Sequence, residues 1–432
     1  MENAFWQSFV STHKKTKVKM KRLSIVIVLL GWLFATSAEA QQRTFDAQLN
    51  GLSVTANYNW LAPPVITLGT DEVVNIGFDH IGKEYHQYTY HVEHCEADWT
   101  TSEELFDIDW LEGFNDQPIE DYAASLNTTV SYVHYQLTIP NELTRLKMSG
   151  NYRLNIIDEE GETAAEIRFM VVEPVAQVGL SVSTNTEIDV NRTHQQLSMS
   201  ISYKSLDVTD PESQLLAVVT QNQRWEEAVV NPNPDRQDFS GKTLEWIHCH
   251  DLIFPAGNEY HKFETLDLSH TTMGLEHIRW DGQAYDAFPF ASEQRRNYLT
   301  DVDADGAFII RNSDNREVDV TCDYVRINYE LRIPRRTDAD VIVSGRWATN
   351  DNPQTYTMQY DEHSQCYRAV IWQKQGYYNY EYRLRYVDGT TAPCPTEGNF
   401  YQTSNRYQAY IYYKGVGGRT WRLIGFRELQ FR

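Results

Sequence analysis

Hydrophobic and polar residues alternate with a period of two in many short segments of this chain. In residues 88–95, every second side chain belongs to one face, made of Tyr88, Tyr90, Val92 and His94. In residues 194–203 apolar side chains alternate with serines, and in residues 378–386 tyrosines and a leucine alternate with charged and amide side chains. This period is typical of half-buried β-strands. Polar turns separate the segments, and none has the length and the 3.6-residue period of an amphipathic helix.

The order of these segments predicts an all-β fold of three consecutive immunoglobulin-like β-sandwich domains. A chain of 432 residues is too long for one small core. Pro174 follows a completed strand, and a fresh strand begins shortly after Cys322. We therefore expect domain boundaries that divide the chain into residues 41–173, 174–321 and 322–432.

The first 40 residues read as a cleavable signal peptide. Lys21 and Arg22 precede the apolar run 23–35, which is short for a membrane span, and Ala38 and Ala40 supply small residues for cleavage. We take Met20 as the true start. The sequence thus predicts an exported protein of the periplasm, with no direct membrane insertion.

The net charge restricts the partners of the protein. The chain has 38 Lys and Arg residues against 60 Asp and Glu residues, a formal charge of -22. Such a balance argues against binding to nucleic acid or to an anionic membrane through a general basic field. The 27 tyrosines suit β-rich domains, in which tyrosine packs well on a pleated surface.

The five cysteines have no short-spaced pair. An odd number leaves at least one thiol unpaired in an exported chain. Cys366 and Cys394 fall in one expected domain and are a possible pair, whereas the favoured interpretation is five reduced, mostly buried thiols.

Several sequence segments in a fixed order resemble one protein family. They include His-Val-Glu-His-Cys-Glu-Ala-Asp-Trp-Thr-Thr-Ser at 91–102, Trp-Leu-Glu-Gly-Phe at 110–114, Gln-Asn-Gln-Arg-Trp at 221–225 and Gln-Gly-Tyr-Tyr-Asn-Tyr at 375–380. The chain resembles the plug proteins of the type IX secretion system of Bacteroidetes along nearly its whole length. The resemblance implies a non-enzymatic periplasmic protein without cofactor. Such a protein seals the periplasmic opening of the giant outer-membrane translocon barrel until substrate is loaded.

The loop after His94 is the candidate contact with that barrel, because loops at one end of a sandwich are free to recognise partners. The candidate residues are His94, Asp98, Trp99, Ser102 and Phe114. A structural role is the alternative. In that case Asp98 and Ser102 close the loop through hydrogen bonds to backbone amides, and Trp99 covers the end of the sandwich core.

Residues 301–306 present a weak calcium candidate. Asp301, Asp303 and Asp305 stand at alternate positions before Gly306, as in the front half of a calcium-binding loop. Asn312 occupies the position at which a bidentate glutamate would complete that loop. The favoured interpretation is a β-hairpin with its turn at Asp305 and Gly306. Histidines and cysteines elsewhere, as at 91–95, lie on opposite faces of their strands, so no other metal site is predicted.

The last expected domain resembles glycogen-binding modules of the immunoglobulin-like, E-set type. Such modules stack sugars on exposed tryptophans, and Trp347 is the corresponding residue, but Asn350 replaces an expected second tryptophan. The alternative function is therefore a periplasmic or secreted carbohydrate-binding β-sandwich protein. An enzyme is not predicted, because the sequence contains none of the short catalytic motifs.

Overall fold

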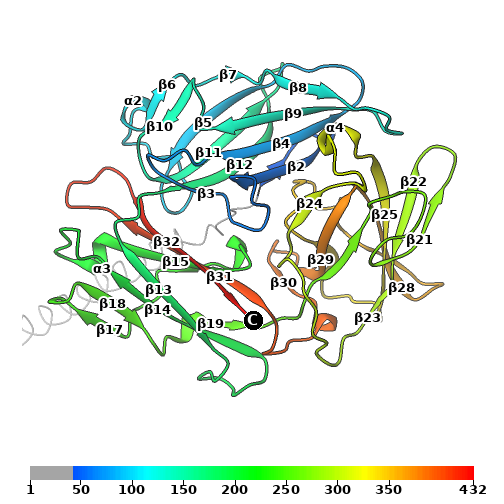
Figure 1. The fold of residues 1–432 in the computed structure, drawn as a ribbon. Coiled ribbons are helices and arrows are strands. Elements are labelled where there is room, and N and C mark those ends of the chain that lie inside the picture. Colours follow the sequence, from blue (N-terminus) through cyan, green and yellow to red (C-terminus); the bar gives the residue numbers. More distant parts are fainter. Residues whose placement is uncertain (1–41) are drawn as a thin grey trace, which may run out of the picture. The chain divides into compact units, whose positions relative to one another are not determined.

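The computed structural model describes residues 42–432, and almost all regular elements in this range are β-strands (Figure 1). The expected all-β fold built from packed sheets is confirmed. The predicted signal peptide, residues 1–40, lies outside the described residues. In residues 42–432, no helix is long and apolar enough to cross a membrane.

The first domain is a sandwich of two sheets around one apolar core. One sheet has the order β1 (Arg43–Thr44), β12 (Thr163–Val172), β11 (Gly150–Ile157), β5 (Thr89–Cys95) and β7 (Gln117–Pro118), with β3 (Val65–Thr67) beside β12. The other has the order β2 (Leu49–Ala56), β4 (Val74–Ile81), β9 (Tyr132–Ile139) and β8 (Asp121–Ala124). A short helix, α2 (Asp107–Trp110), leads into a two-stranded sheet of β6 (Leu111–Gly113) and β10 (Thr144–Leu146).

The alternation in β5 is explained by this core. Tyr90 and Val92 point into the sandwich and are fully buried, whereas His91 and Glu93 on the other face are partly exposed. β5 therefore places the face predicted from its sequence against the opposite sheet.

The middle domain is a second sandwich. Its first sheet has the order β13 (Gln177–Ser183), β14 (His194–Ser202), β18 (Thr243–Trp246) and β17 (Arg236–Asp238), with β19 (Ile253–Pro255) beside β14. Its second sheet has the order β16 (Val229–Val230), β15 (Leu215–Gln221), β31 (Asn405–Tyr413) and β32 (Arg422–Phe431). The helix α3 (Pro211–Gln214) precedes β15, and two 3-10 turns, Trp225–Glu227 and His250–Leu252, follow in this domain.

The third domain lies between β19 and β31 in the sequence. One sheet is centred on β29 (Gly376–Arg385), which pairs with β20 (His261–Glu264), β24 (Phe308–Ile310), β26 (Asp340–Ser344) and β30 (Thr391–Pro393). The other contains β21 (Leu275–Trp280), β22 (Tyr285–Pro289), β25 (Tyr324–Arg332), β28 (Cys366–Lys374) and β27 (Gln359–Asp361), with β23 (Ser292–Glu293) beside β25. The helix α4 (Val318–Thr321) precedes β25, and a 3-10 turn spans Pro395–Glu397.

The third domain is therefore inserted into the middle domain rather than following it. β31 pairs with β15 along seven residues, from Leu215↔Tyr413 to Gln221↔Tyr407, and both strands share a core with β14. The core of the inserted domain draws its residues from 263–394, so the expected boundary at 321/322 falls inside it. Alternation identifies the buried face of a strand but not its partner, which is why the sequence placed residues 405–431 in the third domain.

All five cysteines are free thiols in buried positions. The possible pair of Cys366 and Cys394 is not formed. Burial raises the pKa of the Cys95 thiol and that of the Cys322 thiol, each to about 12, which keeps both protonated and unreactive.

Candidate interaction site

Most of the loop predicted to contact a partner is buried where the first domain meets the middle domain. His94 Nδ1 lies 2.9 Å from the Ser102 hydroxyl, and that hydroxyl lies 3.1 Å from Thr420 Oγ1 in the loop between β31 and β32. The Tyr412 hydroxyl donates to Asn151 Oδ1 at 2.8 Å, alongside the loop. Burial lowers the pKa of His94 to about 4, so the imidazole is neutral at neutral pH. Ser102 thus contacts the middle domain directly, and His94 supports its hydroxyl from within the first domain.

Trp99 has the same structural role. Its indole packs edge-on against Trp225 of the middle domain, with 5.4 Å between ring centroids, and the Arg168 guanidinium lies 5.5 Å from its ring centroid. Only 5% of Trp99 is exposed. Asp98 is exposed, but it closes the turn by accepting hydrogen bonds from the Thr100 amide and hydroxyl. Asp98 thus closes the turn as the structural alternative expects, whereas Trp99 covers a contact between two domains rather than the end of one sandwich core.

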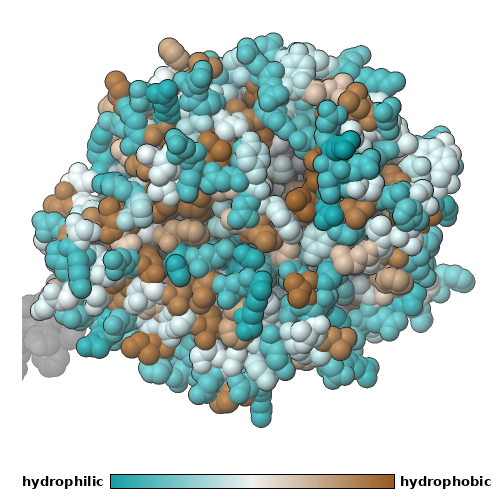
Figure 2. All heavy atoms as spheres, in the orientation of Figure 1, coloured by the Kyte–Doolittle hydropathy of each residue, from teal (hydrophilic) through white to brown (hydrophobic). Residues whose placement is uncertain are grey.

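Phe114, the fifth candidate, lies on a different surface, which we call the α2 corner. The corner is formed by α2, β6 and β10, and it exposes four large apolar side chains by 48–79%: Phe106, Ile108, Phe114 and Leu143. Trp110 and Leu111, on the inner side of the same elements, are buried in the domain core. Figure 2 shows hydrophobic and hydrophilic residues side by side at the upper left, where Figure 1 places α2, β6 and β10.

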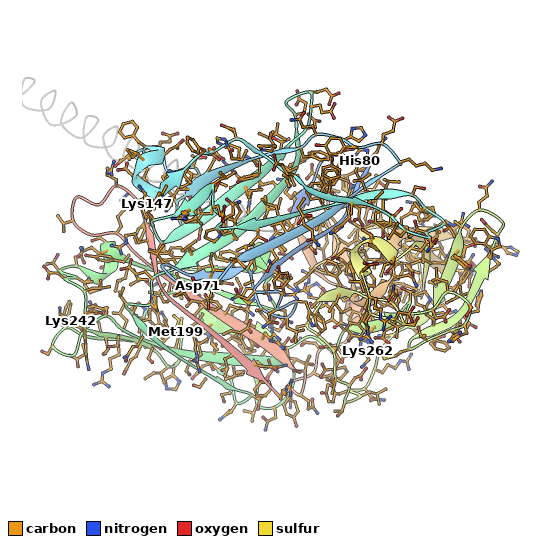
Figure 3. All side chains as sticks on the ribbon, turned by 45° about the horizontal axis from the view of Figure 1, so that its top comes forward. Asp71, His80, Lys147, Met199, Lys242 and Lys262 are labelled. Carbon is orange, nitrogen blue, oxygen red and sulfur yellow. The ribbon has the colours of Figure 1, made fainter. Side chains whose placement is uncertain are left out.

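Backbone and side-chain hydrogen bonds fix the α2 corner. The Phe114 amide donates to the Leu143 carbonyl at 2.8 Å, which sets these two apolar residues beside each other. Lys147 Nζ donates to the Ile108 carbonyl at 2.6 Å and ties the helix to the end of β10 (Figure 3). Asp109 accepts from the Phe106 amide at 2.9 Å and pairs with Arg419 of the β31–β32 loop at 2.8 Å. The corner is thereby connected to the middle domain as well.

The charges around the α2 corner are mostly negative. Its exposed acidic residues are Glu103, Glu104, Asp107, Glu112 and Glu142. The exposed basic residues on the same elements are Arg145 and Lys147. The surface is therefore an apolar patch with an acidic border.

Sequence reasoning found only Phe114 of this patch. The missed signal is the stretch 103–108, Glu-Glu-Leu-Phe-Asp-Ile, in which apolar side chains stand among carboxylates inside a loop. Leu105 packs against the domain core, whereas Phe106 and Ile108 are exposed.

A buried ion pair joins the first domain to the inserted domain. Lys374 Nζ, at the end of β28, donates to Asp79 Oδ2 at 2.7 Å and to the Asp319 carbonyl at 2.6 Å. The Tyr324 hydroxyl donates to the same carboxylate at 2.7 Å, and His134 Nδ1 lies 2.6 Å from its other oxygen. Burial alone would raise the pKa of Asp79, but Lys374 and His134 hold the pKa below its ordinary value.

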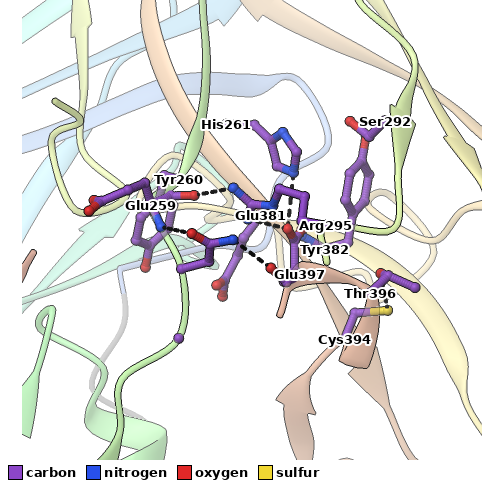
Figure 4. Close-up of polar contacts among 12 residues, drawn as sticks. Glu259, Tyr260, His261, Ser292, Arg295, Glu381, Tyr382, Cys394, Thr396 and Glu397 are labelled. Carbon is purple, nitrogen blue, oxygen red and sulfur yellow. Dashed lines mark hydrogen bonds and ion pairs between the residues drawn. The ribbon is translucent and has the colours of Figure 1, made fainter. Parts of the chain in front are cut away.

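Glu397 fastens both connections between the middle and inserted domains (Figure 4). Its carboxylate pairs with Arg295, lies 3.0 Å from His261 Nε2 and accepts from the Tyr382 amide at 2.8 Å. Its carbonyl accepts from Asn258 Nδ2 at 2.7 Å, in the outgoing connection. Burial alone would raise the pKa of Glu397, yet His261 and Arg295 lower it to about 2. Glu397 therefore contacts the outgoing segment through its backbone carbonyl and the inserted domain through its carboxylate.

All three domains meet at the carbonyl of Leu61. This oxygen accepts from Gln223 Nε2 of the middle domain at 3.2 Å and from Arg346 Nη1 of the inserted domain at 3.4 Å. Two ion pairs, Arg224–Glu381 and Arg383–Glu227, add charge contacts between the middle and inserted domains. The three sandwiches thus form a mutually contacting set.

The carboxylates of the calcium candidate are bound by separate partners. Lys262 Nζ donates to Asp301 Oδ1 at 2.5 Å, the Tyr260 amide donates to Asp303, and Arg406 Nε donates to Asp305 Oδ2 at 2.8 Å. Within residues 42–432, no group of three or more His, Cys, Asp and Glu side chains is placed to hold a metal ion. The turn at 305–306 exists, but β24 pairs with β29 and not with a strand at residue 298, so the hairpin interpretation was wrong.

The tryptophan named for sugar binding is a core residue. Trp347 is buried, stacks parallel to Tyr329 and donates its indole N–H to the Asn379 carbonyl at 2.8 Å. It therefore offers no face to a sugar ring.

Comparison with known proteins agrees with the family resemblance. No curated protein matches the chain. A crystal structure of a hypothetical protein from Parabacteroides merdae ATCC 43184 shares 34% sequence identity with it and superposes with a TM-score of 0.87. The match covers 90% of this chain and 99% of the other. A family model described as the first domain of the type 9 secretion system plug protein matches residues 49–173. The chain therefore belongs to the family of type 9 secretion system plug proteins.

Proposed function

We propose that this protein binds the periplasmic side of the outer-membrane translocon barrel of the type IX secretion system and closes it until substrate is loaded. Family membership carries this proposal, because the family model of the plug protein's first domain matches residues 49–173, which form the first sandwich. The role is steric and requires no catalytic group or cofactor. It places the protein in the periplasm.

The contacts between the domains support a steric role. A seal must keep its shape against thermal motion, and separate domains joined by flexible linkers would not do so. Here Asp79–Lys374, the Leu61 carbonyl and the Arg224–Glu381 ion pair connect every pair of domains. Breaking any of these contacts would leave a buried charge or polar group without its partner, which opposes separation of the domains.

Binding is tested by affinity capture from detergent-solubilised outer membranes of the native organism. The tagged protein is the bait, and mass spectrometry identifies the captured proteins. We expect one very large barrel protein to be enriched, and we expect that enrichment to fall when the barrel is occupied by substrate. Capture of no barrel protein by the folded bait would refute the proposal.

Closure is tested separately on purified translocon in proteoliposomes. Addition of the protein to the periplasmic face should lower the flux of a small fluorescent solute, whereas addition to the outer face should have no effect. If the protein binds the translocon without changing the flux, it associates with the translocon but does not close it.

A further inference from the structure

The α2 corner has the features of a protein-binding surface. Four large apolar side chains are each about half exposed or more at this corner: Phe106, Ile108, Phe114 and Leu143. Apolar residues exposed singly are normal on soluble proteins, whereas several on neighbouring elements mark an interaction surface. Two of the four are phenylalanines, and large aromatic side chains dominate the energy of many interfaces.

The exposed side chains are not required by the fold. Trp110 and Leu111 fill the core from the inner side of the same elements. The four outer side chains are exposed and do not belong to the domain core. Their replacement by polar residues should cost little stability, since surface changes away from buried features are usually within about 0.5 kcal/mol.

The surface is also preorganised. The hydrogen bond of Lys147 to the Ile108 carbonyl and the pairing of Asp109 with Arg419 hold α2 against two domains. A partner that binds here need not order the segment first, and this favours affinity.

The charges specify the partner. Glu103, Glu104, Asp107 and Glu112 border the apolar side chains, so a partner with acidic neighbours would be repelled. A complementary surface combines an apolar socket with lysine and arginine side chains around it.

We propose that the α2 corner is the surface through which this protein docks on the translocon, against an apolar socket bordered by lysine and arginine on its periplasmic side. This inference rests on the proposed function and adds to it the contact surface and the chemistry of the partner. Phe106 and Phe114 are the apolar anchors, and the carboxylates orient the approach.

The test compares matched variants in the capture experiment. The corner variant carries Phe106→Ser and Phe114→Ser. The control variant carries Phe239→Ser and Leu299→Ser, which are equally exposed on the middle and inserted domains. A third variant, Glu103→Gln with Glu104→Gln, changes charge alone. Thermal unfolding establishes that each variant is folded as the unmodified protein is.

We expect the corner variant to capture at least about tenfold less barrel protein, while the control variant captures the normal amount. The charge variant should bind the barrel more weakly than the unmodified protein at low salt. Because it has fewer charges for salt to screen, its binding should fall less than that of the unmodified protein between roughly 50 and 500 mM salt. If the corner variant captures as much barrel as the unmodified protein, the inference is overturned and the proposed function stands. If the unmodified protein captures none, the proposed function itself fails.

Discussion

Lys374 and Asp79 form an ion pair between two domains, with 2.7 Å between Nζ and Oδ2 and no more than 2% of either side chain exposed. The pair lies 295 residues apart in the sequence. A charge at such a depth is stable only with its partner, so the contact between the first and inserted domains depends on both residues.

Replacement of Lys374 by methionine should destabilise the protein by about 3–5 kcal/mol, because it leaves the Asp79 carboxylate buried without its cation. Urea unfolding followed by tryptophan fluorescence measures the change. Arg335→Met is the matched control, since its ion pair with Glu362 is largely exposed and should contribute at most about 1 kcal/mol. Equal effects of the two substitutions would contradict the assigned role of Lys374.

Replacement of Asp303 by asparagine should change how stability depends on pH. Burial, together with the nearby Asp305, raises the pKa of Asp303 to about 7. The folded state therefore holds a proton that the unfolded state releases near pH 4, and stability falls as the pH rises from about 4 to about 7. The variant lacks this loss. Relative to the unmodified protein, it should gain about 3 kcal/mol between pH 4.5 and pH 8 in urea unfolding. A constant difference across this range would show that Asp303 ionises normally.

Replacement of Glu397 by glutamine should weaken the contact between the returning connection and the inserted domain. At pH 7 the variant should be less stable by about 2–4 kcal/mol, because His261 and Arg295 lose their counter-charge. The pKa of Glu397 is lowered to about 2, so its contribution is present above about pH 4.5 and is lost as the pH falls towards 2. The difference between variant and unmodified protein should therefore shrink in acid. Limited proteolysis should also cut residues 398–404 faster in the variant at pH 7.

Experiments should distinguish the roles of Trp99 and Phe114, which were both predicted from the sequence as partner contacts. Trp99→Ala should cost about 3–5 kcal/mol of stability, because it empties the space against Trp225. Phe114→Ala should leave the melting temperature nearly unchanged and reduce barrel capture. Calorimetry and the capture assay distinguish the two effects, and the opposite pattern would place the contact surface at the loop after His94.

Sequence reasoning recovered the strands and their buried faces well, because a period of two is a local property. His94 was placed on the same face as Tyr90 and Val92, and the structure buries all three. The partners of the strands are not local. Tyr407 to Tyr413 fits any sheet by its pattern, yet it pairs with residues 215–221. The burial of Trp99 could not be predicted for the same reason, since it depends on Trp225 and Arg168, which lie in other parts of the chain.

The insertion between β19 and β31 imposes an order on folding. The chain is synthesised from its amino terminus, so β15 is made early. Its neighbour β31 follows only after the roughly 150 residues of the inserted domain. Until then the apolar run Leu215–Val219 lacks a strand on one edge, and an unpaired apolar edge invites association with other chains. The first and inserted domains contain all their own strands and are able to fold without waiting. The middle sandwich is thus the last to close, and it is the part of the nascent protein with the greatest need of a chaperone.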